Sequence, residues 1–192
     1  MLNRHIADNR IKYLCGVFLF VAGVVWGCSS VMRFTPEKLS GLVSFFSSSA
    51  EQGRTATFIS VYKRCLIENF KCVFIFLILS FTSYTCWLCL GLSFIKGFSS
   101  GFTATFLIKN YGVHGVVYTL LGICPSMVLH VVVRLFAAVV CINFACDRIR
   151  SKALGARAAL GVVPPLAVIW VIMCAFSLYD AFISPPLFKS LF

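Results

Sequence analysis

The sequence predicts an all-α integral membrane protein, a single helical domain of 192 residues with about five transmembrane helices. Three observations lead to this prediction. Hydrophobic residues make up 60% of the chain, and the mean hydropathy is +0.95. Only 12% of the residues are charged, whereas soluble domains carry roughly 25%. Apolar runs long enough to cross a bilayer recur along the chain with basic residues beside them, so the net charge of +11 indicates membrane anchoring and not nucleic-acid binding.

The first apolar run covers residues 13–32. Because the preceding segment, residues 1–12, is basic, this span is expected to start in the cytoplasm. Residues 33–71 form the most polar segment of the chain and are expected to fold into two short amphipathic helices on the outer membrane face. That segment either caps the bundle or provides a docking surface for a partner.

The second and third spans are assigned to residues 72–94 and 95–111. The third is short, because Lys96 and Lys109 enclose twelve residues that rise only about 18 Å in a helix, and a bilayer core needs about 30 Å. If both lysine side chains extend to opposite membrane surfaces, they anchor this span and reduce the mismatch between its length and the bilayer thickness. Like the first span, it carries two glycines with three residues between them, a spacing that lets helices approach closely. The two pairs are Gly23 with Gly27 and Gly97 with Gly101.

Residues 115–146 are expected to form the fourth span, kinked at Pro125 because proline lacks a backbone N–H and disturbs a helix. The fifth span is assigned to residues 160–179. The remaining residues, 180–192, form a short tail rich in proline and aromatic side chains.

Charge determines the expected topology. The basic segment 147–157, which includes Arg148 and Arg150, is the strongest cytoplasmic signal in the chain. With the N-terminus also in the cytoplasm, this segment lies inside only if residues 95–111 cross the membrane completely. The sequence therefore predicts five spans, with the N-terminus inside and the C-terminus outside.

Arg134 lies near the middle of the fourth span, and His130 lies one helical turn earlier on the same face. A charge at that depth is costly and normally has a partner, and the candidates are Glu68, Asp180 and backbone carbonyls near Pro125. The favoured interpretation is that His130 and Arg134 form a buried polar pair that fixes helix packing. The alternative is a transport or ligand site, as in a small transporter or permease-like protein.

No enzyme activity, cofactor or metal site is expected. The sequence contains no phosphate-binding glycine loop, no zinc-hydrolase or serine-hydrolase motif and no pair of carboxylates suited to acid–base catalysis. The one redox pattern is "CWLC", Cys86 and Cys89, but Cys86 lies about 21 Å along a helix from Cys72. Thiol exchange with a soluble partner needs access, so a disulfide-generating enzyme is a weak alternative.

Several stretches, taken in their order and spacing, resemble the stage II sporulation protein M family of endospore-forming bacteria. The first span reads "VFLFVAGVVWG", and "FFSSSAEQG" follows it. The densest similarity is in "FIKGFSSGFTATFLIKNYGVHG", with Pro125 ten residues further on, and "DAFISPPLFK" resembles the end of the family pattern. Two features depart from that pattern, "CPSM" after the proline position and Arg134.

The resemblance implies a non-enzymatic, multi-pass membrane scaffold in endospore formation. Proteins of this family are expected to recruit two partners to the sporulation septum, a membrane-anchored amidase/endopeptidase and a lytic transglycosylase. Those partners degrade septal peptidoglycan while the mother-cell membrane engulfs the forespore. The expected contact surfaces in this chain are residues 33–71 and the glycine-rich faces of the first and third spans.

Overall fold

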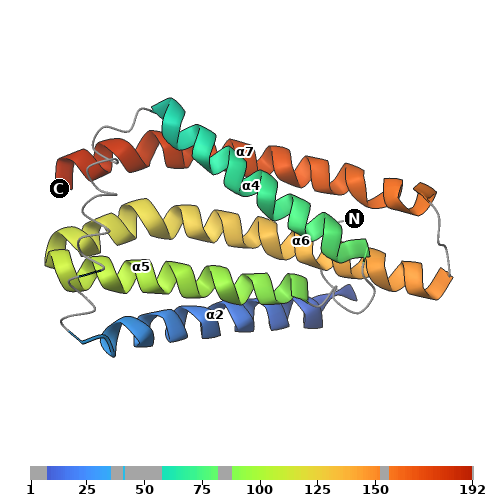
Figure 1. Ribbon diagram of the computed structural model, residues 1–192, viewed down its shortest axis with the longest axis horizontal. Helices are drawn as coiled ribbons and strands as arrows, with labels where there is room; N and C mark the ends of the chain where they lie inside the picture. The colour runs from blue at the N-terminus through green and yellow to red at the C-terminus, as the bar shows by residue number, and fades with distance from the viewer. Residues whose placement is uncertain (1–7, 36–40, 42–57, 82–87, 152–155, 192) are drawn as a thin grey trace.

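The computed structural model describes residues 8–35, 41, 58–81, 88–151 and 156–191, and these form an elongated bundle of helices (Figure 1). No strand occurs among these residues. The helices are α2 (Arg10–Met32), α4 (Phe58–Phe81), α5 (Leu88–Tyr118), the short π-helix η1 (Thr119–Ile123), α6 (Cys124–Ser151) and α7 (Ala156–Leu191).

Three stretches of the described chain are long and apolar enough to cross a membrane, judged by length and composition. They are Arg10–Met32, Leu88–Asp147 and Val163–Ile183. Large apolar side chains point outward from the bundle, and Phe18, Trp26 and Phe182 are 71%, 65% and 67% exposed. Outward-facing apolar side chains of this size suit a hydrocarbon environment and not water.

Helix α6 lies at the centre of the bundle. It supplies a run of small and branched side chains to the core, which lets α4, α5 and α7 approach it. The α6 members of this core are Ala137, Ala138, Cys141, Ile142 and Ala145. Helix α2 lies at the edge of the bundle along α5 and reaches α6 near its own N-terminus, where Lys12 Nζ donates a hydrogen bond to Asn143 Oδ1.

The chain reverses at Gly112, which has φ 54° and ψ −124° inside the stretch from Leu88 to Tyr118. A side chain with a Cβ rarely adopts this conformation, so glycine permits the reversal. Pro125 directly follows the π-helix η1, and the helical backbone continues from η1 into α6, so the helix widens just before the residue that cannot donate a backbone hydrogen bond. The chain therefore reverses at Gly112 and not at Pro125, and the disturbance expected at Pro125 takes the form of the π-helix η1 just before it.

The assignment of residues 72–94 to one span is wrong. Helix α4 ends at Phe81 and α5 begins at Leu88, so the expected span is divided between two helices, with residues 82–87 outside the described part. The third span is correspondingly longer than expected, because residues 88–111 rise about 36 Å. Hydropathy could not locate this boundary, since the sequence remains apolar on both sides of it.

The other boundaries also shift. The second expected amphipathic helix is the beginning of α4, which continues without a break from Phe58, and the first lies outside the described residues. Helix α6 extends through the start of the basic segment to Ser151. Helix α7 continues to Leu191, so the expected short tail is helical. The prolines at 185 and 186 suggested that the helix ends before them, because each lacks the N–H that bonds a carbonyl one turn earlier. Inside a bundle, neighbouring groups can satisfy such carbonyls.

Candidate functional site: a polar cavity inside the helix bundle

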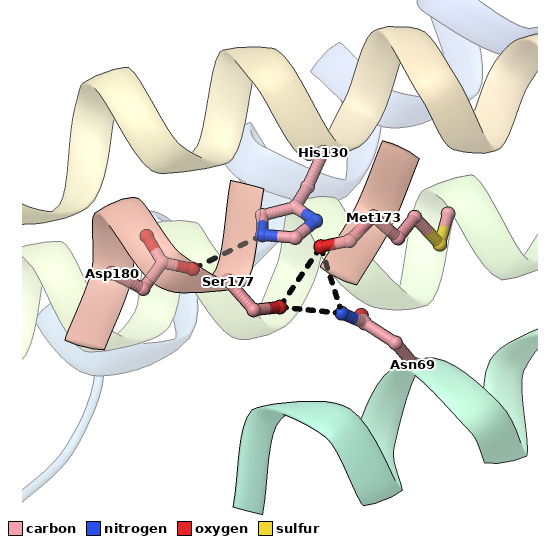
Figure 2. Close-up of polar contacts among 5 residues, drawn as sticks. All are labelled: Asn69, His130, Met173, Ser177 and Asp180. Atoms are coloured by element: carbon pink, nitrogen blue, oxygen red, sulfur yellow. Dashed lines mark hydrogen bonds and ion pairs between the residues drawn. The ribbon is translucent and has the colours of Figure 1, made fainter. Parts of the chain in front are cut away.

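Polar side chains gather in the bundle interior where α4, α6 and α7 face one another (Figure 2). Asn69, His130 and Ser177 are only 3%, 7% and 0% exposed. Buried polar groups are costly unless they are hydrogen-bonded. Their contacts therefore show what holds these three helices in register.

His130 pairs with Asp180, and this contact connects α6 to α7. The Nε2 and Oδ2 atoms lie 3.0 Å apart, and an imidazole with a proton on Nε2 donates it to the carboxylate (Figure 2). The edge of the His130 ring also meets Phe176, with ring centroids 6.3 Å apart and planes at 81°. The histidine is thus held by α7 and not by Arg134, its expected partner on the same helix.

Asn69 connects α4 to the same stretch of α7. Its Nδ2 donates hydrogen bonds to Ser177 Oγ at 2.7 Å and to the Met173 carbonyl at 3.3 Å. The Ser177 hydroxyl in turn donates to that carbonyl at 3.0 Å (Figure 2). No pattern in the sequence indicated Asn69, although a buried asparagine one turn before the apolar half of α4 is a recognisable polar contact in a membrane helix.

A cavity of about 210 Å³ lies beside these hydrogen bonds, among α4, α5, α6 and α7. A second cavity of about 320 Å³ opens between α4, α5 and α6. Both are lined by Glu68, Lys96 and Arg134, so the two cavities meet at these charged side chains. Lys96 and Arg134 are partly buried there and Glu68 is exposed, and all three lie away from the ends of their helices.

The expectation that Lys96 marks the end of a span is wrong. Helix α5 begins eight residues earlier, and Lys96 projects into both cavities. Lys109, by contrast, is exposed close to the reversal at Gly112. The side chains of Arg148 and Arg150 lie outside the described residues, although α6 passes through both positions.

Arg134 lines the cavities without a protein partner in the described part of the chain. Its buried Nε–H donates no hydrogen bond there, and neither Arg134 nor Lys96 forms an ion pair with a described carboxylate. Of its candidate partners, Asp180 is engaged by His130, and Glu68 lies 3.5 Å from Arg64 on the outer side of α4. The cavity therefore has two cations, and no carboxylate of the described residues lies within ion-pair distance of either.

The four glycines singled out from the sequence all lie in the contact between α2 and α5. An added Cβ on Gly23 or Gly27 would overlap the carbonyl oxygen of Phe94 or Phe98. On the other helix, a Cβ on Gly97 or Gly101 would overlap the carbonyl oxygen of Phe20 or Val24. The partners advance together along both chains, so the two helices run parallel with their backbones in contact. These glycine faces are occupied within the chain itself, which removes them as free contact surfaces.

The chemistry available in the cavity is electrostatic. Among the described residues, no group of three or more His, Cys, Asp or Glu side chains has the arrangement of a metal site. Cys86 of the "CWLC" pattern lies outside the described residues, and Cys89 is a buried free cysteine in the core. The two cations suit the binding of an anionic group, because Arg and Lys are the side chains that proteins use for phosphate and carboxylate.

Residues 16–185 match the family described as Stage II sporulation protein M. No curated protein matches this chain, and no solved structure matches it. The matched region begins early in α2 and ends in the last part of α7, so it includes the polar cavity and the contact between α2 and α5. The resemblance inferred from the sequence is confirmed, and the chain belongs to the stage II sporulation protein M family.

Proposed function

We propose that this protein is a non-enzymatic membrane scaffold of endospore formation. In this role it recruits and anchors peptidoglycan-degrading proteins at the septum while the mother-cell membrane engulfs the forespore. The observation that carries the proposal is the family match, which extends over residues 16–185 and so over nearly the whole helical bundle. Membership of this family links the chain to sporulation, and the apolar helices link it to a membrane.

The proposed topology has five crossings, with the N-terminus in the cytoplasm and the C-terminus outside. The parallel packing of α2 and α5 supports it, because two parallel spans require α4 to return across the membrane between them. The basic segment at the end of α6 then lies in the cytoplasm. Cysteine labelling at Ser49→Cys and Ser151→Cys tests this arrangement. Labelling from opposite sides is expected, and labelling of both from one side would overturn it.

The proposed partners are a membrane-anchored amidase/endopeptidase and a lytic transglycosylase. Because the glycine faces are packed within the chain, the partner contacts are assigned to the segment between α2 and α4 and to the outward face of α2. That face presents the exposed side chains of Val25 and Trp26 at the edge of the bundle, next to the start of the connecting segment. A single membrane anchor of a partner could lie along it.

Affinity purification from sporulating cells tests the partner assignment. Both peptidoglycan-degrading partners should co-purify with the tagged protein. A photo-crosslinking residue at Trp26 should capture a partner, and one at Val171, an equally outward position on α7, serves as the control. Deletion of the gene should block engulfment and disperse the partners from the septum. Normal engulfment with correctly placed partners in the deletion strain would refute the scaffold role.

A further inference from the structure

We propose that the joined cavities between α4, α5 and α6 bind an anionic phospholipid, with its phosphate at Lys96 and Arg134 and part of an acyl chain between α4 and α5. This inference does not depend on the role in sporulation. It rests on the charges in the cavity, on the apolar groove beside them and on the direction in which the groove opens.

The two cations require a counter-ion. Lys96 and Arg134 line both cavities, yet within the described chain neither is paired with a carboxylate. Removing a charge from water without a partner is costly, and intramembrane cations are normally paired or face a polar cavity. The planar guanidinium of arginine matches the geometry of a phosphate, and a lysine ammonium adds a second charge-assisted hydrogen bond.

The cavity beside this charged centre is apolar. Buried Phe76 of α4 and half-buried Leu92 of α5 form its wall, and Ile75 and Ile95 form its rim. Both rim side chains are exposed on the lateral surface of the bundle, at 41% and 62%. The groove therefore opens sideways between α4 and α5, toward the surface that apolar residues cover, and not only toward one end of the bundle.

The polar and apolar parts lie on opposite sides of the two cations. The smaller, polar cavity extends from Lys96 and Arg134 toward the turn between α5 and α6, where Tyr118 and Ser126 line it. The apolar groove extends the other way, toward the C-terminal half of α4 and the first turns of α5. An amphiphile from the leaflet near the α5–α6 turn fits this order, with its headgroup toward that turn and its chain toward the bilayer centre. A free phosphate would leave the groove unused.

Two carboxylates in the lining oppose an anion. Asp180 lines only the polar cavity and is paired with His130, whereas Glu68 lines both cavities. Its side chain is 58% exposed, and its carboxylate lies 3.5 Å from Arg64, a cation outside both cavity linings. The competing arrangement is internal, with Glu68 turned inward to neutralise Lys96 or Arg134. The two arrangements make opposite predictions for Glu68→Gln. If the cavities bind an anion, removing this carboxylate strengthens binding; if Glu68 pairs with Lys96 or Arg134, removing it breaks the ion pair and lowers stability.

The test measures lipid binding to the full-length protein, purified in neutral detergent and stripped of lipid, by native mass spectrometry and by thermal unfolding. Phosphatidylglycerol should bind and raise the melting temperature, and phosphatidylcholine and diacylglycerol should not. Lys96→Met and Arg134→Gln should each weaken phosphatidylglycerol binding about tenfold, the loss expected for one charge-assisted hydrogen bond. Lys109→Met, an exposed lysine of the same helix outside both cavities, is the matched control and should bind as the wild type does.

Two further variants keep the test decisive if a charge variant fails to fold. Ile95→Trp should fill the mouth of the groove and weaken lipid binding while both cations remain, and Glu68→Gln should bind phosphatidylglycerol at least as tightly as the wild type. Equal stabilisation by inorganic phosphate alone would overturn the lipid assignment. Equal binding of phosphatidylglycerol by the wild type and all cavity variants, or loss of stability in Glu68→Gln without any lipid effect, would overturn the site.

Discussion

The contact between α2 and α5 makes a sharp prediction for Gly23→Ala. An added Cβ would overlap the Phe94 carbonyl oxygen and would lie 3.0 Å from Phe94 C and Phe98 N. All three are backbone atoms, so no side-chain rotation relieves the overlap, and the two helices must separate. A separation of roughly 1 Å forfeits up to half of the dispersion attraction of the atoms in contact.

The expected loss follows from two opposing effects. Overpacking at a close contact costs about 1–3 kcal/mol, whereas replacing a helical glycine by alanine gains up to about 1 kcal/mol. We therefore expect Gly23→Ala to lower the free energy of unfolding by about 1–2 kcal/mol. Gly91→Ala in α5 is the matched control, because no heavy atom lies within 4 Å of the Cβ position there. It should be neutral or stabilising.

Unfolding of the purified protein in mixed micelles, titrated with sodium dodecyl sulfate and followed by tryptophan fluorescence, measures both variants. The two alanine substitutions should change stability in opposite directions, or at least differ by more than about 1 kcal/mol. If Gly23→Ala proves as stable as Gly91→Ala, the backbone contact between α2 and α5 does not hold the bundle together.

Three further predictions use the same unfolding measurement. Asp180→Ala should lower the free energy of unfolding by about 1–3 kcal/mol, because it leaves His130 without its partner. In a double-mutant cycle, Asp180→Ala and His130→Ala should show a coupling energy, and strictly additive losses would argue against the pair. Asn69→Ala should also lower the free energy of unfolding by about 1–3 kcal/mol, because it removes the hydrogen bonds from α4 to α7. If the variant is as stable as the wild type, α4 is held by apolar packing alone. Gly112→Ala should lower the free energy of unfolding by about 1–3 kcal/mol through backbone strain at φ 54°. No heavy atom lies within 4 Å of its Cβ position, so the loss would not come from a steric overlap. A stability equal to that of Gly91→Ala would contradict the reversal at Gly112.

The polar cluster shows why a site in this chain was only partly predictable. Arg134 and His130 stood out because charged and polar side chains are rare in apolar helices. Their spacing suggested that they pair with each other, but His130 contacts Asp180, fifty positions away in sequence. Lys96 was misread for a related reason, since a lysine beside an apolar run looks the same whether it ends a helix or faces a cavity.

The sequence alone determined the class of protein and its family. Composition requires that most side chains face an apolar medium, and the order of motifs along the chain is enough for the family match over residues 16–185. Only the tertiary structure decided where the helices end and which polar groups meet. A continuous apolar run has the same hydropathy wherever the chain reverses, whereas in the folded protein α4 packs mainly against α7 and α5 mainly against α2. Lys96 and Arg134 likewise meet only in the folded protein, where two separate helices bring them to the same cavities.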